Sequence, residues 1–178
     1  GKVQFMGQNR NFAYIPEQPV LYEELTFWEH LELVAAAYEL ERSTFLEKAE
    51  YLLKLFCLQD VKHHFPTTFS KGMQQKVMII ISLLIEPDVY IIDEPFVGLD
   101  PRATLELLRF LNEERMRGAG ILISTHQLDM AERICDSIFL MADGQLIAQG
   151  NPDEIREKCQ LPGATLFDCF NAILENQT

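Results

Sequence analysis

The chain has 178 residues, of which 48% are hydrophobic and 24% are charged, as expected for one soluble globular domain with a sizeable core. The 27 acidic residues outnumber the 15 basic ones, and the net charge of −12 argues against a nucleic-acid binder with a basic surface stripe. The longest apolar run, residues 77–85, is less than half of the ~20 residues that span a bilayer. The four cysteines have no C-x-x-C spacing, so reduced thiols are expected.

The chain begins at Gly1, and we expect further residues to precede it in the natural protein. Gly1-Lys2 resembles the end of a phosphate loop, G-x-x-x-x-G-K-[ST], but Val3 lacks the hydroxyl that would ligate Mg²⁺. Residues 2–6 alternate between polar and apolar side chains, which predicts a first strand there.

A second strand is predicted at residues 12–15, after a polar turn. It leads into Pro16-Glu17-Gln18-Pro19, where the two prolines stiffen the backbone around Gln18. A glutamine on such a loop can reach a phosphate-bound Mg²⁺ or its water. The alternative is an ordinary polar loop residue.

Residues 26–66 are predicted to form a helical insert between strands. Thr26-x-x-Glu29 is a capping box that opens a helix through Tyr38. A second helix is expected to begin at Ser43 or Thr44, with Glu47 closing a box on Thr44. Its apolar positions follow the repeat of one helix face: Phe45, Leu46, Ala49, Leu52, Leu53 and Phe56.

The stretch Phe69-Ser70-Lys71-Gly72-Met73-Gln74 precedes an apolar helix that is predicted to reach Ile85. Ser70 is a suitable N-cap, and Gly72 allows a ligand to approach the backbone. A helix N-terminus with a hydroxyl and a lysine can bind an anion. The alternative is an ordinary capped helix.

Residues 89–92 are four large apolar residues, which predict a strand buried on both faces in a parallel sheet. Asp93 and Glu94 follow, and Pro95 ends the ladder. Open α/β sheets bind ligands at the carboxyl ends of their strands. There one acid can hold Mg²⁺ through water and the next can take a proton from an attacking water. The alternative is a solvated strand end.

Gly98-Leu99-Asp100-Pro101 is predicted to be a tight loop that starts a helix over residues 101–117, ended by Gly118. A buried strand over residues 120–125 then delivers His126 to the same edge of the sheet, although a lone histidine is more often structural. The remaining residues predict a helix at 127–135, a hairpin of 138–141 with 145–148 turned by Asp143-Gly144, a short helix from Pro152 and a closing helix at 164–174.

Taken in order, these motifs resemble the ATP-binding subunit of an ABC transporter. Gln18 matches the Q-loop, residues 70–74 the signature motif, Asp93-Glu94 the Walker B motif, Gly98-Leu99-Asp100 the D-loop and Ser124-Thr125-His126 the switch histidine. The signature is similar to that of ATPases paired with ABC-2-like bacterial membrane subunits, and residues 14–25 are similar to the Ecs-type subunit.

The chain departs from the family in two places. The usual signature is Leu-Ser-Gly-Gly-Gln, whereas Phe69, Lys71 and Met73 stand here for the Leu, the first Gly and the Gln. The phosphate loop is missing from this chain, which we therefore interpret as N-terminally truncated and inactive by itself.

The resemblance implies an α/β fold: a P-loop NTPase (RecA-like) core with a mostly parallel sheet, plus a helical ABC subdomain. The expected division is residues 1–25 for strands and Q-loop, 26–88 for the helical subdomain with the signature, and 89–178 from Walker B to the C-terminal helices.

The resemblance also implies ATP and Mg²⁺ as ligands and a role for each motif. Glu94 is the expected general base, and Asp93 is expected to hold Mg²⁺ through water. Gln18 would sense Mg²⁺ and the γ-phosphate, and His126 would donate to the γ-phosphate. Ser70, Lys71, Gly72, Met73 and Gln74 would face ATP held by a second copy or a paired ATPase subunit, and Asp100 would cross that interface.

The expected partner is the transmembrane permease subunit of a transporter, docked on the helical insert and Gln18. The subunit would be cytoplasmic and peripheral on the inner face of the cell membrane, with no nucleic-acid partner. Two alternatives remain open: a soluble ABC-type ATPase acting on nucleic acid or ribosomes, and an inactive interaction module.

Overall fold

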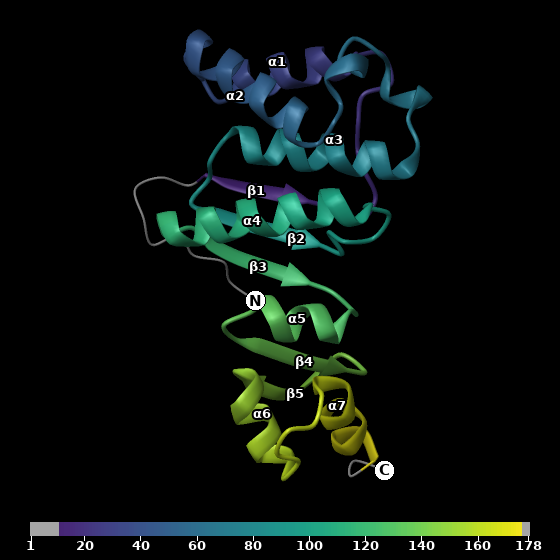
Figure 1. The fold of residues 1–178 in the computed structure, drawn as a ribbon, viewed down its shortest axis with the longest axis vertical. Helices are drawn as coiled ribbons and strands as arrows, with labels where there is room; N and C mark the ends of the chain where they lie inside the picture. Colours follow the sequence, from purple (N-terminus) through teal and green to yellow (C-terminus); the bar gives the residue numbers. More distant parts are fainter. Residues whose placement is uncertain (1–10, 176–178) are drawn as a thin grey trace. The chain divides into compact units, whose positions relative to one another are not determined.

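The computed structural model describes residues 11–175, so the strand predicted at residues 2–6 lies outside the described part of the chain. The chain divides after Ser124 into two compact units, residues 1–124 and 125–178 (Figure 1).

The first unit contains a parallel sheet in the order β1-β2-β3. The strands are β1 (Phe12–Ile15), β2 (Val89–Asp93) and β3 (Gly120–Ser124). The register pairs Ile15 with Ile92, and Asp93 with Ser124. The three predicted strands are thus confirmed, with β3 ending one residue earlier than expected. All three carboxyl ends lie at one edge of the sheet.

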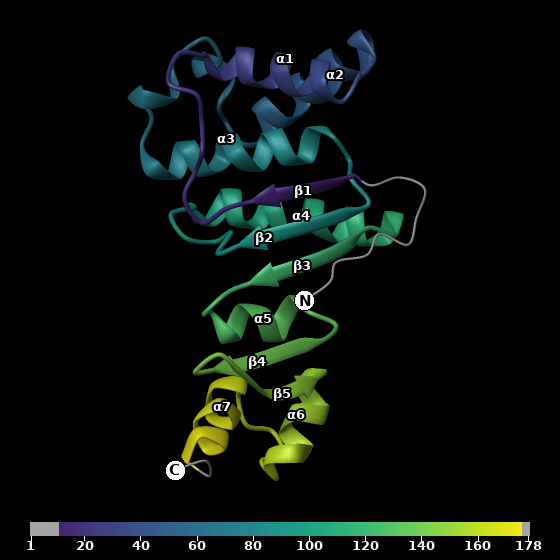
Figure 2. The same cartoon turned by 180° about the vertical axis from the view of Figure 1, so that it is seen from behind.

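The two faces of this sheet differ in burial. Tyr90 and Ile92 of β2 are buried on the face that α4 (Pro101–Arg117) covers (Figures 1 and 2). The expectation that β2 is buried on both faces was wrong for the other face. There Val89 and Ile91 are only half-buried, because no helix of residues 11–124 covers that face as α4 covers the first.

A polar network ties β2 to α4 inside this core. Glu114 is buried, with 6% exposure, and its Oε2 accepts from the Tyr90 hydroxyl over 3.0 Å. Arg117 donates to the same carboxylate oxygen over 3.0 Å from Nε and also binds the backbone carbonyl of Pro87. Burial, together with the Glu114 charge, raises the pKa of Tyr90, so its hydroxyl remains a donor.

Besides α4, the described part of the first unit contains three helices and two 3₁₀ turns. They are α1 (Phe27–Ala37), α2 (Arg42–Leu55), η1 (Gln59–Val61), η2 (Pro66–Thr68) and α3 (Lys71–Leu84). The two turns were not predicted. The packed face of these helices includes side chains with at most 1% exposure: Phe27, Leu31, Phe45, Leu52, Leu53, Phe56, Ile79, Ile80 and Leu83.

The helix starts were predicted with mixed success. The Thr26–Glu29 capping box of α1 is present, with both reciprocal bonds formed. The cap predicted for α2 was wrong: the helix begins one residue earlier than Ser43, and the Glu41 carboxylate accepts from the N–H groups of Ser43 and Thr44. A longer acid can therefore serve where a hydroxyl was expected. Leu46, predicted to be on the buried face, is exposed.

The second unit contains the antiparallel pair β4 (Ile138–Ala142) and β5 (Gln145–Gly150) with three helices. The helices are α5 (Leu128–Ile134), α6 (Pro152–Cys159) and α7 (Leu166–Glu175). The predicted hairpin turn is confirmed, with Asp143 at φ 49° and Gly144 at φ 74°. Positive φ at both positions is the type I′ geometry that suits a two-residue hairpin.

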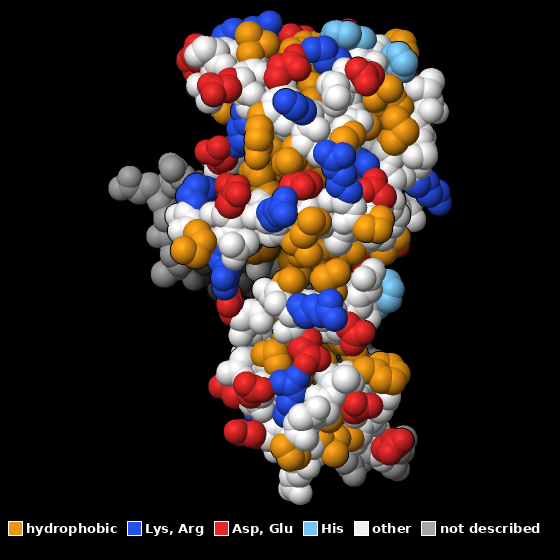
Figure 3. Space-filling view, viewed as in Figure 1, with side chains coloured by type: hydrophobic (Ala, Val, Ile, Leu, Met, Phe, Trp, Pro, Cys, Tyr) orange, Lys and Arg blue, Asp and Glu red, His pale blue; other side chains and the backbone are white. Residues whose placement is uncertain are grey.

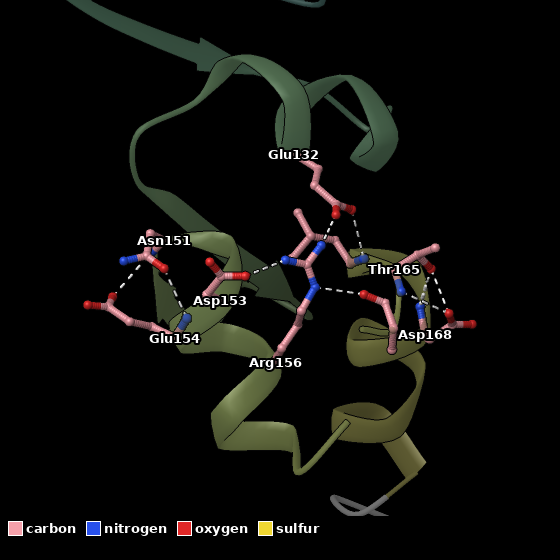
Figure 4. A network of polar contacts seen from close by, with 9 residues as sticks. Glu132, Asn151, Asp153, Glu154, Arg156, Thr165 and Asp168 are labelled. Atoms are coloured by element: carbon pink, nitrogen blue, oxygen red, sulfur yellow. Dashed lines mark hydrogen bonds and ion pairs between the residues drawn. The ribbon is translucent and has the colours of Figure 1, made fainter. Parts of the chain in front are cut away.

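Arg156 joins three helices of this unit (Figure 4). Its guanidinium forms ion pairs with Glu132 of α5 and Asp153 of α6, and its Nε donates to the Ala164 carbonyl over 2.8 Å. Glu132 also accepts from the N–H of Leu166 at the start of α7 over 3.1 Å. Each of the three guanidinium nitrogens of this partly buried side chain thus has an acceptor.

Within residues 11–175, no helix combines the length and the apolar character that crossing a membrane requires.

The Tyr90 network generates a stability prediction. Tyr90→Phe removes the hydroxyl donor but keeps the ring, leaving a buried carboxylate with one partner fewer. We expect the free energy of unfolding to fall by about 1–3 kcal/mol, measured by urea denaturation. The control is Tyr51→Phe, an identical change at an exposed position, expected to stay within about 0.5 kcal/mol. Equal losses in the two variants would contradict a role for the Glu114 bond.

Candidate nucleotide-binding and hydrolysis site

Polar side chains follow the ends of β1 and β2 in the first unit. Gln18 is exposed, three residues after β1. Asp93 is the last residue of β2, and its Oδ1 accepts from the Ser124 hydroxyl over 2.5 Å. Because Asp93 and Ser124 are register partners in neighbouring strands, the sheet itself sets this pair. The Ser124 hydroxyl holds one oxygen of the Asp93 carboxylate and thereby also sets the direction of the other oxygen.

Glu94 lies in a backbone conformation that non-glycine residues seldom adopt. Its φ is +47°, its N–H donates to the Ser124 carbonyl over 2.9 Å, and its carbonyl accepts from the Val97 N–H over 3.2 Å. The two bonds hold the chain in a turn directly after the strand. Left-handed geometry of this kind is concentrated at functional sites, where surrounding contacts hold it in place.

The residues at the end of β2 fit a magnesium ion better than a fully protein-ligated metal. Asp93 offers a hard carboxylate oxygen, and Gln18 an amide oxygen, both of the type that Mg²⁺ binds. In the described part of the chain, no three His, Cys, Asp or Glu side chains converge to hold a metal. Mg²⁺ in nucleotide sites keeps several waters and takes one or two carboxylates plus phosphate oxygens, so a single oriented aspartate suits it.

The N-terminus of α3 carries the signature residues. Ser70 caps it by accepting from the Met73 N–H over 3.3 Å, as predicted. Ser70 and Lys71 are exposed, and Gly72 and Met73 are half-buried. The side chain of Gln74 turns back and donates to the Pro66 carbonyl over 2.9 Å, which ties η2 to the helix. The N-terminal N–H groups of this fourteen-residue helix therefore lie next to the exposed side chains of Ser70 and Lys71.

The signature helix lies directly against the loop after Glu94. A methyl group built on Gly72 would overlap the carbonyl oxygen of Gly98, so the two backbones approach more closely than any side chain permits. Gly98 itself has φ +78°, which favours glycine. Two glycines in two motifs are thus needed for one contact.

An ion pair strengthens the same contact. Lys76 Nζ lies 2.6 Å from Asp100 Oδ2, while Asp100 Oδ1 accepts from the Ala103 N–H over 2.9 Å and caps α4. The hydrogen bond from Lys76 holds the pKa of the Asp100 carboxyl below its usual value. Lys76 was not among the predicted site residues, because nothing local to the sequence links it to an aspartate 24 positions away. Its place one helical turn after Gly72 was the available signal.

His126 belongs to the second unit. It is exposed, two residues after the end of β3, and it lines a hollow of about 550 Å³ with Asp129, Arg133 and Phe167. The structure therefore brings together Asp93, Glu94 and Ser124, and separately Gly72, Gly98, Lys76 and Asp100. The role of His126 stays a prediction.

A parallel sheet with acidic residues at the end of its central strand, beside a helix that presents a capped N-terminus, has the features of a nucleotide-binding α/β domain. The model of the ABC transporter family matches residues 4–97. The chain belongs to the ABC transporter family, as the motifs indicated.

Among curated relatives, the chain is 51% identical to the uncharacterized ABC transporter ATP-binding protein YthP of Bacillus subtilis, over 90% of this chain and 68% of the relative. It is 49% identical to the ABC-type transporter ATP-binding protein EcsA of Bacillus subtilis, over 92% of this chain and 66% of that protein. The chain thus spans about two thirds of these relatives' length, and their similarity agrees with the Ecs-type resemblance.

Solved structures support the fold. The ATP-binding subunit of an ABC transporter superposes with a TM-score of 0.88 at 50% identity, covering 92% of this chain and 68% of that one. The ATP-binding cassette MJ0796, solved as a dimer bound to ADP and Pi, has a TM-score of 0.69 at 23% identity and supports the fold alone. The predicted P-loop α/β class is confirmed.

The Gly72–Gly98 contact gives a prediction. Gly72→Ala adds a methyl group against a backbone oxygen, and relieving the overlap should cost about 1–3 kcal/mol. The gain in helix propensity returns at most about 1 kcal/mol, so we expect a lower urea midpoint.

The control is Gly120→Ala, whose new methyl group would have its nearest neighbours at 3.9 Å, an ordinary contact. It is expected to change the free energy of unfolding by about 0.5 kcal/mol or less. A Gly72→Ala protein at least as stable as this control would show that the two loops do not need their close contact.

Proposed function

We propose that this chain is part of the ATP-binding and hydrolysing subunit that powers transport by an ABC transporter. The observation that carries the proposal is the end of β2, where Asp93 is oriented by Ser124 and Glu94 is held in a left-handed turn. A sheet edge that orients one acid and holds the backbone of the next in a turn can separate two roles that hydrolysis needs, metal binding and proton transfer.

Each residue of the predicted motifs has one task in the proposed reaction. Asp93 holds Mg²⁺ through water, and Mg²⁺ when bound neutralises charge on the β- and γ-phosphates. Glu94 accepts a proton from, or orients, the water that attacks the γ-phosphate. Gln18 contacts the metal and its water from the loop after β1. His126 donates a hydrogen bond to the γ-phosphate oxygens.

The signature helix serves a second nucleotide in the proposal. Ser70 and Lys71 are exposed at a helix N-terminus that favours anions, so they suit ATP held by another copy of the chain or a paired ATPase subunit. Gly72, Met73 and Gln74 complete that surface. Asp100, at the start of α4, is paired with Lys76 of the signature helix α3. In the proposal, Asp100 moves with α3 and so couples the nucleotide site of one subunit to the interface with the other.

The proposed partner is a transmembrane permease, which places the subunit in the cytoplasm at the membrane's inner face. The names of YthP and EcsA support this, as both are ABC transporter ATP-binding proteins. The alternative of a nucleic-acid-remodelling ATPase is less well supported. Lys and Arg side chains on the face in Figure 3 are interspersed with Asp and Glu rather than gathered in a stripe.

Replacing the proposed base tests the function. In the full-length protein, Glu94→Gln keeps the shape of the side chain but removes the proton acceptor. Steady-state ATP turnover should fall by roughly 10²–10⁴-fold while ATP binding persists. Glu113→Gln, an identical change at an exposed position of α4, is the control and should leave turnover intact. A fall of less than about tenfold for Glu94→Gln would reject Glu94 as the base.

The 178-residue chain by itself contains no G-x-x-x-x-G-K-[ST] sequence. That loop holds the β- and γ-phosphates through its N–H groups and lysine. We therefore expect the isolated chain to show no Mg²⁺-dependent ATP hydrolysis above a Glu94→Gln version of itself, in a phosphate-release assay. Turnover clearly above that background would contradict the expectation.

A further inference from the structure

His30 is a buried histidine of α1 whose two ring nitrogens both contact the backbone. It is 4% exposed. Nδ1 lies 2.8 Å from the carbonyl oxygen of Thr26, and Nε2 accepts from the N–H of Tyr22 over 2.9 Å. Because a carbonyl only accepts and an amide N–H only donates, the proton is on Nδ1 and the lone pair is on Nε2.

The bond to Tyr22 fixes the far end of the loop that carries Gln18. The near end is Ile15, fully buried and paired with Ile92 in the sheet. Residues 16–21 are the only six residues between these two anchors, and Gln18 is the third of them. Two prolines in this segment restrict its backbone, so fixing both ends leaves the loop few conformations.

The buried His30 side chain holds a loop whose own side chains are mostly exposed. Val20, Tyr22 and the Gln18 side chain are exposed, so the loop gains little from burial of its own side chains. The Tyr22 ring lies beside the imidazole, with centroids 5.9 Å apart and ring planes tilted by 32°. A loop with so little buried surface depends on its few backbone bonds to stay in place.

We propose that His30 is a positioning residue that holds residues 16–21, and with them Gln18, in the geometry needed for ATP hydrolysis. The inference rests on the proposed function. His30 has no contact with nucleotide in this role; it acts only through the Tyr22 N–H. Losing the acceptor frees one end of the loop, and misplacement of a positioned group by about 1 Å can cost on the order of 10²-fold in rate.

Two substitutions separate this role from general stability. The amide of His30→Asn sits near the position of Nδ1 and keeps the donor to Thr26, but it does not reach Tyr22. The amide of His30→Gln extends to the position of Nε2 and keeps an acceptor for the Tyr22 N–H. Each variant loses one buried backbone bond, so the two should lose similar amounts of thermal stability. His64→Asn, at an exposed histidine, is the control for the chemical change.

The first readout needs no nucleotide. Amide hydrogen exchange of residues 16–22 in the full-length protein should speed up at least about tenfold in His30→Asn and remain near wild type in His30→Gln and His64→Asn. Equal exchange in His30→Asn and His30→Gln would overturn the anchor.

The second readout is ATP turnover with KM and kcat measured separately. We expect His30→Asn to lower kcat by about tenfold or more with KM for ATP nearly unchanged, and His30→Gln to restore kcat. In a Gln18→Ala background the effect of His30→Asn on kcat should vanish, because both changes disable the same group. An undiminished effect in that background, or equal losses in Asn and Gln variants, would overturn the proposal. An inactive wild-type protein would instead overturn the proposed function.

Discussion

The parallel pairing of β2 with both of its neighbours is the constraint on which the candidate site depends. It sets Asp93 opposite Ser124 and brings the loop after β1 to the same edge. The buried bond between Tyr90 and Glu114 then fixes β2 against α4, whose first turn is capped by Asp100. Residues that are far apart in sequence thus reach one edge because a short central strand holds them in register.

Local signals in the sequence predicted the elements well. Thr26 with Glu29, Ser70, Pro101 and Gly118 each mark a helix end by chemistry that acts within three or four residues, and each is where the structure has it. The prediction of the α2 cap failed because Glu41, which is not one of the usual capping residues, has a side chain long enough to accept from the first N–H groups of the helix.

Contacts between elements could not be predicted in this way. The pair Lys76–Asp100, the contact of Gly72 with Gly98 and the bond from Tyr22 to His30 each need the fold to bring the partners together. Motif spacing predicted that residues 70–74 and 98–100 both matter, but not that they touch. Periodicity likewise placed Leu46 inside, since an apolar residue at the margin of a helix face fits both sides of the boundary.

The sheet face that no helix of residues 11–124 covers has a practical consequence for handling the isolated chain. Tyr14, Ile91 and Leu122 form one row across the three strands, and Tyr14 and Leu122 are 51% and 57% exposed. A row of exposed aromatic and aliphatic side chains favours association, so solutions of the 178-residue chain should bind hydrophobic dyes and self-associate as concentration rises. Its yield and colloidal behaviour will depend on what shields that row.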